Sequence, residues 1–311
     1  MGVWIDTDMG FDDITAIMVV DVAARKRPEL TIDGVSLLFG NAPLDQVKRN
    51  ASGAASAFGW SFPIHAGRAL PVMGRLETAT SILSDHGMPT AGLRLPDVAV
   101  PPMGDAFEAL CRWLEGEGPR RILALGPLTN IAAVALARPD LAARITDLVW
   151  MGGGVTLGNH TASAEFNAFA DPEAAAIVLA HGIPFKMVDL DLCRQVLASH
   201  ADVEPVRAAG GVNAALVADL LDGFIAIATS RGRAAMALYD AVAAVAFIDE
   251  NLVEWRSARI DIELAGTVTR GRTVVETRSA KAEYNAAYGA TIAVEPARSI
   301  ILETLRLEGS R

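Results

Sequence analysis

Short β-like runs alternate with longer helical patterns along most of this chain, and no other feature restricts its fold as strongly. Strands are predicted over residues 2–5, 30–39, 121–125, 148–151 and 185–190, and helices over residues 14–25, 45–58, 105–115, 130–137 and 172–181. Such alternation is typical of βαβ units with parallel strands. No linker, composition break or fixed-period repeat divides the sequence. We therefore predict a single α/β domain over residues 1–311, with a mostly parallel central sheet flanked by helices.

The C-terminal part departs from this alternation. Residues 259–277 alternate apolar and polar side chains around Arg270-Gly271, which indicates a β-hairpin. We expect this hairpin to pack beside the main sheet.

The charge balance excludes several classes of partner. The 27 Lys and Arg residues against 37 Asp and Glu residues give a net charge of −10, and no basic run is present. Because a basic surface is what neutralises a phosphate backbone, neither nucleic acid nor an anionic membrane is an expected partner. Cys111 and Cys193 have the spacing of neither a disulfide framework nor a zinc site. The N-terminal residues lack the charged and apolar regions of a signal peptide, which predicts a cytoplasmic protein.

The first predicted strand ends in an acidic loop, DTDMGFDD at residues 6–13, with four carboxylates within eight residues. Carboxylates crowded at one strand end repel each other, and a multivalent cation relieves that repulsion. Every evident donor is an oxygen, so the loop favours a hard cation such as Ca²⁺ or Mg²⁺ over zinc. The spacing excludes an EF-hand, because position twelve of that loop carries no acid.

Two other interpretations of this loop stay open at this point. Asp12 or Asp13 can cap the following helix, since Asp is a common N-cap residue. Capping accounts for one or two of the carboxylates but not for all four. An Asp-x-Asp pair is also typical of Mg²⁺-dependent phosphatases of the haloacid-dehalogenase type.

The acidic loop resembles the N-terminal signature of the inosine-uridine-preferring nucleoside hydrolase family, and other stretches resemble that family in the same order. They are Gly40-Asn41, His86-Gly87, LGPLTN at residues 125–130, MGGG at residues 151–154, Gly158-Asn159, AEFN at residues 164–167, Asp171-Pro172, Tyr239-Asp240 and Thr269-Arg270-Gly271. The resemblance implies a Rossmann-like nucleoside hydrolase fold and calcium-dependent hydrolysis of ribonucleosides to ribose and free base. It also implies a homodimer or homotetramer, with a small-molecule nucleoside as the substrate.

The resemblance assigns a metal site and a general base. The implied Ca²⁺ ligands are the side chains of Asp8, Asp13 and Asp240 and the backbone carbonyl of Leu125. Asp8 also matches the base that takes a proton from the metal-bound water. A hard cation that lowers the pKa of water and holds vicinal hydroxyls is suited to this task.

The resemblance assigns the substrate contacts as well. Residues that match positions holding the ribose hydroxyls are Asp12, Asn159, Glu165 and Asn167. Met151 matches a residue lining the sugar pocket, and Asn41 and His86 match residues near the glycosidic bond and the base. Carboxylate and amide groups supply the acceptors and donors that hydroxyls need. Carboxylates near the ribose also favour an oxocarbenium-like transition state.

One departure from the family pattern concerns the leaving base. Many members carry a His before the last metal-binding Asp as the leaving-group acid, and Tyr239 stands there in this chain. Tyrosine is a weaker acid than imidazolium, so base activation is expected to differ, with Tyr239 stacking on or hydrogen-bonding the base. We expect residues 222–238 to form a wall over the base. His65, His160, His181 and His200 are expected in loops or at the surface.

Two functions from other classes remain as alternatives. A ribose- or nucleoside-binding protein can keep the metal cage and lose catalysis with the change at Tyr239. A Mg²⁺-dependent phosphatase is less consistent with the ribose-type cluster at residues 159–167.

Overall fold

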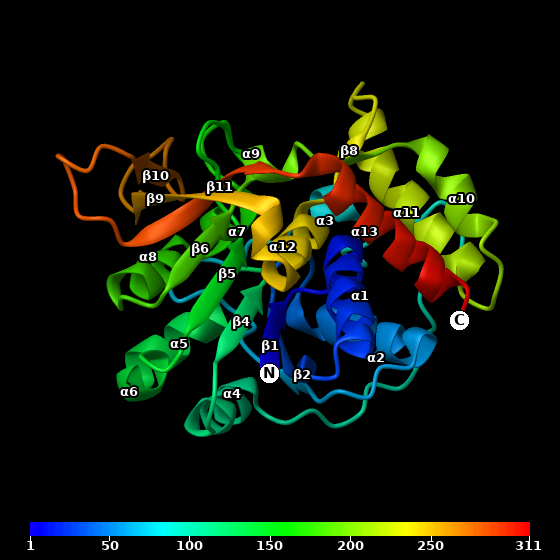
Figure 1. Ribbon diagram of the computed structural model, residues 1–311, viewed down its shortest axis with the longest axis horizontal. Coiled ribbons are helices and arrows are strands. Elements are labelled where there is room, and N and C mark those ends of the chain that lie inside the picture. The colour runs from blue at the N-terminus through cyan, green and yellow to red at the C-terminus, as the bar shows by residue number, and fades with distance from the viewer.

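A nine-stranded sheet forms the centre of the computed structural model, which describes residues 1–311 (Figure 1). Its order is β10-β9-β11-β6-β5-β4-β1-β2-β3. The strands are β1 (Gly2–Thr7), β2 (Thr31–Leu37), β3 (Ile64–Ala66), β4 (Arg121–Ala124), β5 (Asp147–Met151), β6 (Phe185–Val188), β9 (Val253–Ile262), β10 (Thr273–Glu276) and β11 (Ala286–Ile292). Neighbours from β11 through β6 to β3 are parallel, whereas β9 is antiparallel to both β10 and β11. The mostly parallel α/β architecture predicted from the sequence is confirmed.

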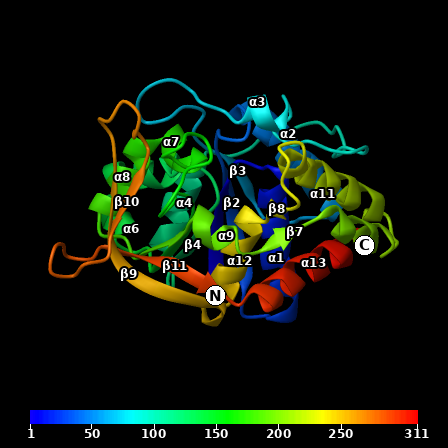
Figure 2. The same cartoon turned by 90° about the horizontal axis from the view of Figure 1, so that it is seen from above.

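Helices cover both faces of this sheet (Figure 2). One face carries α1 (Phe11–Lys26), α2 (Leu44–Phe58), α11 (Ala214–Thr229), α12 (Tyr239–Ile248) and α13 (Val294–Gly309). The other face carries α4 (Ala106–Glu115), α5 (Thr129–Ala137) and α8 (Pro172–Ala180). The shorter elements are α3 (Thr80–Leu83), α6 (Pro139–Ala142), α7 (Phe166–Ala170), α9 (Leu190–Cys193), α10 (Val203–Arg207), β7 (Leu197–Ala198) and β8 (Met236–Ala237). No helix combines the length and apolar character needed to cross a membrane.

Side-chain alternation along the strands divides the interior into two cores. In β1, Val3 and Ile5 pack with α1 and α12, while Trp4 packs on the opposite face with α4 and α5. In β5, Val149 and Trp150 divide in the same way. Successive side chains of a strand point to opposite faces, so a strand that is apolar throughout must be covered on both sides. This is why the central strands are continuous hydrophobic runs.

The carboxyl ends of the central strands lie at one edge of the sheet. Asp6 pairs with Ala124, and Ala124 pairs with Trp150, so the residues after β1, β4 and β5 emerge together. The Leu125 backbone N–H donates to the Asp6 carbonyl at 2.8 Å, which joins the first two of these ends. Ligands of open α/β sheets bind beyond such strand ends.

The predicted hairpin is present, and it continues the sheet instead of packing beside it. Thr273 of β10 pairs with Ile262 of β9, and Arg270-Gly271 lies in the loop between them. The strand β11, which the sequence analysis did not identify, inserts between β9 and β6. Its weakly apolar sequence AAYGATI gives little local signal, because its place depends on pairing with distant strands.

The N-cap of α4 gives a stability test. The Asp105 side chain accepts a hydrogen bond from the Glu108 backbone N–H at 2.9 Å. Replacing Asp105 with Ala leaves that N–H without its partner, so we expect the free energy of unfolding to fall by about 0.5–2 kcal/mol. Urea unfolding followed by circular dichroism measures the change. The control Glu117→Ala removes one exposed carboxylate that makes no cap, and an equal loss in both variants would contradict the assignment.

Candidate active site

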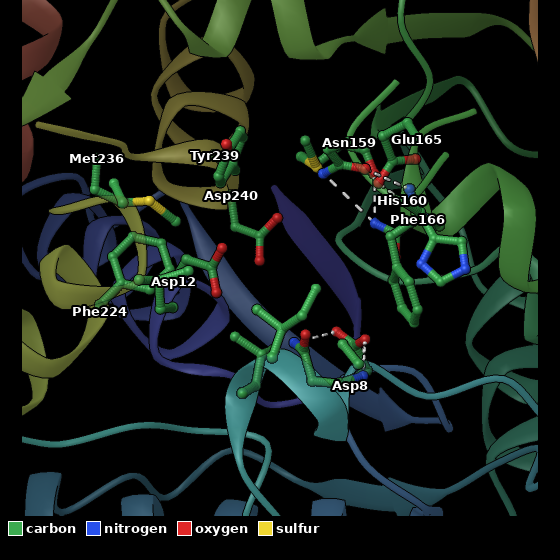
Figure 3. A pocket seen from close by; sticks show the side chains of 18 of the residues that line it. Asp8, Asp12, Asn159, His160, Glu165, Phe166, Phe224, Met236, Tyr239 and Asp240 are labelled. Carbon is green, nitrogen blue, oxygen red and sulfur yellow. Dashed lines mark hydrogen bonds between the residues drawn. The ribbon is translucent and has the colours of Figure 1, made fainter. Parts of the chain in front are cut away.

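A pocket opens at the carboxyl edge of the sheet, and we call it the main pocket (Figure 3). Most of the residues predicted from the sequence line it: Asp8, Asp12, Asn41, Leu125, Met151, Asn159, Glu165, Asn167, Tyr239 and Asp240. Asp12 and Asp240 point toward each other in the middle of the view, between Phe224 and Met236 on one side and Asn159 and Glu165 on the other. Segments that are far apart in the sequence therefore meet at one cavity.

The acidic loop is held in shape by its own hydrogen bonds. The Asp13 carboxylate accepts from the Thr7 hydroxyl at 2.6 Å, the Gly10 backbone N–H at 2.8 Å and the Asp8 backbone N–H at 3.2 Å. Met9 adopts a left-handed backbone with φ of 50°, which turns the chain between the strand and the helix. The helix α1 begins at Phe11, so Asp12 and Asp13 lie in its first turn. Asp13 thus caps α1 by accepting from the Gly10 N–H, as one of the alternatives expected. Asp8 and Asp12 line the main pocket instead.

Asn41 ties two of these carboxylates together. Its backbone N–H donates to Asp8 Oδ2 at 2.6 Å, and its side-chain amide donates to Asp8 Oδ1 at 3.1 Å and to Asp13 Oδ2 at 3.0 Å. Asn41 follows β2, so the register of β2 against β1 brings it to this position. Its contacts orient Asp8 toward the main pocket.

The carboxylates form a buried cluster of like charge. Asp12, Asp13 and Asp240 can each bring one oxygen within 4.8 Å of the others. Burial, with repulsion from Asp13, raises the pKa of Asp12 to about 7. Burial and neighbouring carboxylates also raise the pKa values of Asp8 and Asp240 well above the usual range. A buried group of acids, none of them ion-paired with Lys or Arg, is what a divalent cation stabilises, and the all-oxygen donor set fits a hard ion.

Glu165 and Asn167 fix the polar wall of the main pocket, on the other side of the carboxylates from Phe224 and Met236. Glu165 caps α7, and its carboxylate accepts from the backbone N–H groups of Gly153 at 2.8 Å, Asn167 at 2.8 Å and Ala168 at 3.0 Å. Burial raises the pKa of Glu165 to about 7, although these N–H groups lower it. The Asn167 amide donates to the carbonyls of Leu125 at 2.7 Å and Met151 at 2.9 Å, which fixes the ends of β4 and β5 beside each other.

The remaining wall comes from residues 222–238, as predicted, together with α3. Its members at the main pocket are Phe224, Ile227, Ala228, Arg231, Arg233 and Met236 from the first segment and Ile82 and Leu83 from the second. Most of these side chains are apolar, and the charged ones are two arginines. Ile82 and Leu83 could not be predicted as site residues, because a short exposed helix has no distinctive sequence pattern.

Tyr239 lies at the start of α12, immediately before Asp240. Burial raises the pKa of its hydroxyl, although Arg194 and Arg233 act to lower it. The Cys193 thiol donates to the Tyr239 backbone carbonyl at 3.5 Å. The tyrosine is therefore a neutral hydrogen-bonding group near neutral pH and not a ready proton source.

Two histidines lie in places other than those expected from the sequence. His86 does not line the main pocket; it lines a second cavity beside α2, where the Asn50 amide donates to its backbone carbonyl at 2.9 Å. His160, expected in a loop or at the surface, does line the main pocket and packs against Phe169 with ring centroids 4.5 Å apart. Its position next to Asn159 was the one available signal in the sequence.

Comparisons with known proteins show the family to which this chain belongs. The family model for inosine-uridine preferring nucleoside hydrolase matches residues 3–298. A relative named pyrimidine-specific ribonucleoside hydrolase RihA, from Salmonella arizonae, is 33% identical over 276 residues, covering 88% of this chain and 87% of its own length.

Solved structures show the same likeness. A plant nucleoside hydrolase has a TM-score of 0.88 at 25% identity, with 98% of each chain covered. A purine-preferring ribonucleoside hydrolase from Gardnerella vaginalis has a TM-score of 0.89 at 25% identity, covering 100% of this chain and 99% of its own. The chain therefore belongs to the inosine-uridine preferring nucleoside hydrolase family, and it is an enzyme of the ribonucleoside hydrolase type, which acts on N-glycosyl compounds.

Proposed function

We propose that this enzyme hydrolyses ribonucleosides to ribose and free base with a bound Ca²⁺. The observation that carries the proposal is the buried carboxylate cluster at one end of a pocket whose other residues suit a sugar and a base. Asp13 and Asp240 of this cluster would hold the ion together with Asp8, with the Leu125 carbonyl as a further ligand, while Asp12, the third member of the cluster, would bind the sugar. When bound, the ion supplies a positive charge that lowers the pKa of water and polarises hydroxyl groups.

The chain's own residues would bind and orient the sugar. Ribose hydroxyls are both donors and acceptors, and Asp12, Asn159, Glu165 and Asn167 offer both kinds of group at the main pocket. Glu165 and Asn167 are fixed by backbone contacts, so they meet the substrate without rearrangement. Carboxylates around the ribose stabilise the positive charge that develops as the glycosidic bond breaks.

Asp8 is the proposed general base. Both of its oxygens are oriented by Asn41, and its carboxylate faces the main pocket. An ionised carboxylate within hydrogen-bond reach of a water molecule accepts its proton as that water attacks the anomeric carbon.

The end of the main pocket formed by residues 222–238 and Tyr239, which we call the base end, favours nucleobases that present hydrogen-bond acceptors. Arg231, Arg233 and Tyr239 are the polar side chains of this wall, and guanidinium groups only donate. Such donors match the carbonyl oxygens of hypoxanthine, guanine and uracil, and they stabilise negative charge on the departing base. The names of the relatives mention pyrimidine and purine preferences in turn, so we derive this preference from the residues of this chain alone.

The role of Asp8 gives a kinetic test. We expect Asp8→Asn to lower kcat by roughly 10²–10⁴-fold, because the amide cannot accept the proton of the attacking water. Reducing-sugar release from inosine and uridine with added Ca²⁺ measures the loss. The matched control Asp45→Asn removes an exposed carboxylate of α2 and should keep full activity. Nucleoside binding without cleavage by the wild-type enzyme would instead favour a binding protein.

Metal removal gives a second test with two readouts. We expect chelation to abolish cleavage and to lower the melting temperature, because the clustered carboxylates then repel each other without compensation. Ca²⁺ should restore both properties better than Zn²⁺, since the donors are oxygens. Full activity in protein shown by elemental analysis to be metal-free would rule out the proposed cofactor.

The base preference gives a third test. We expect higher kcat/KM for inosine and uridine than for adenosine and cytidine, because adenine and cytosine place an amino donor where the others have a carbonyl. In Arg231→Gln/Arg233→Gln the preference should fall toward parity, since glutamine both donates and accepts. Equal kcat/KM values for all four nucleosides in the wild type would contradict this account of the base end.

A further inference from the structure

A second cavity lies outside the main pocket and has no part in the proposed reaction. Its volume is about 390 Å³, within the range of roughly 300–1,000 Å³ that is common for small-molecule sites. It is lined by residues from α2, from the loop 86–97 and from α11. The floor is apolar, with Met88 and Leu220 buried beneath it.

The charge of this cavity is opposite to that of the whole chain. Arg49, Arg94 and His86 line it, and Asp97 is its one carboxylate. Neither guanidinium is ion-paired; the nearest partner of Arg49 is the Gln46 side-chain oxygen at 3.4 Å. Both arginines are exposed, and because neither is paired with a carboxylate, their N–H donors are free to bind a ligand in the cavity.

The helix α2 adds amide groups to the same cavity. Gln46, Arg49 and Asn50 share one face of the helix, since residues three and four apart are neighbours. The Gln46 amide donates to the Asn50 side-chain oxygen at 2.9 Å, and Asn50 in turn donates to the Met9 carbonyl at 3.1 Å. The cavity is therefore linked to the acidic loop through a single side chain.

We propose that this cavity binds the phosphate group of a small molecule, with Arg49 and Arg94 as its charged partners. Guanidinium groups match phosphate oxygens with paired hydrogen bonds, and two of them balance the dianion. The apolar floor and the limited volume suit a small phosphate ester, whereas the acidic surface disfavours a polyanion such as nucleic acid.

Calorimetric titration of the calcium-loaded protein tests this proposal. The probes are inorganic phosphate and ribose 5-phosphate, each at constant ionic strength, with neutral ribose as the uncharged comparison. The variants are Arg94→Gln and Arg49→Gln/Arg94→Gln. The matched control Arg306→Gln removes an exposed, unpaired arginine of α13. Circular dichroism and nucleoside cleavage report whether each variant is folded.

We expect saturable binding of one or both phosphate probes, weakened at least about tenfold in the double variant and unchanged in Arg306→Gln. Tighter binding of ribose 5-phosphate than of inorganic phosphate would identify an ester as the ligand, and equal binding would identify the free anion. The proposal fails if neither probe binds below the order of 10 mM. It also fails if the double variant binds as tightly as the wild type, since the anion is then held elsewhere.

Discussion

The repulsion among buried carboxylates at the end of β1 is the constraint on which the site depends. Four carboxylates lie together here without a basic partner, which is unfavourable for stability: those of Asp8, Asp12, Asp13 and Asp240. Isolated buried charge is costly, and it persists where other interactions or a ligand compensate for it. Here the compensation begins with N–H and O–H donors from the loop itself and from Asn41.

The rest of the fold serves to bring the partners of this loop to the same edge. Parallel pairing of β1 with β4, and of β4 with β5, sets Leu125 and Met151 beside the loop, and Asn167 joins their carbonyls. The helix α12 packs on α1 and delivers Asp240 from more than two hundred residues away in the sequence. Long-range packing thus completes a site that the N-terminal loop begins.

Local patterns were sufficient to predict the core of this architecture. Hydrophobic runs of strand length alternating with helical patterns gave the parallel sheet, and Asp105 marked a helix start correctly. The helix predicted from residue 14 begins three residues earlier, at Phe11, because Asp12 and Asp13 lie in its first turn and do not precede it. The strand β11 was missed since its pairing with β9 and β6 is a long-range property.

The site was predictable to the extent that its residues stand next to strand ends or in recognisable motifs. His86 and His160 show the limit, because which loop side chain faces a cavity depends on packing that has no sequence period. The cavity at Arg49 and Arg94 was likewise invisible in the sequence, where these arginines lie 45 positions apart among ordinary surface residues.

The two ends of the main pocket come from separate stretches of the chain. The carboxylates and the polar sugar-side residues come from the strand-end segments and α12, whereas the opposite wall comes from α3 and residues 222–238. Substitutions in α3 or in the 222–238 wall can therefore alter the shape and polarity of one end while the other keeps its geometry. A lineage built on this fold can change which compounds it accepts by substitutions in those two segments, without altering the part that performs the chemistry.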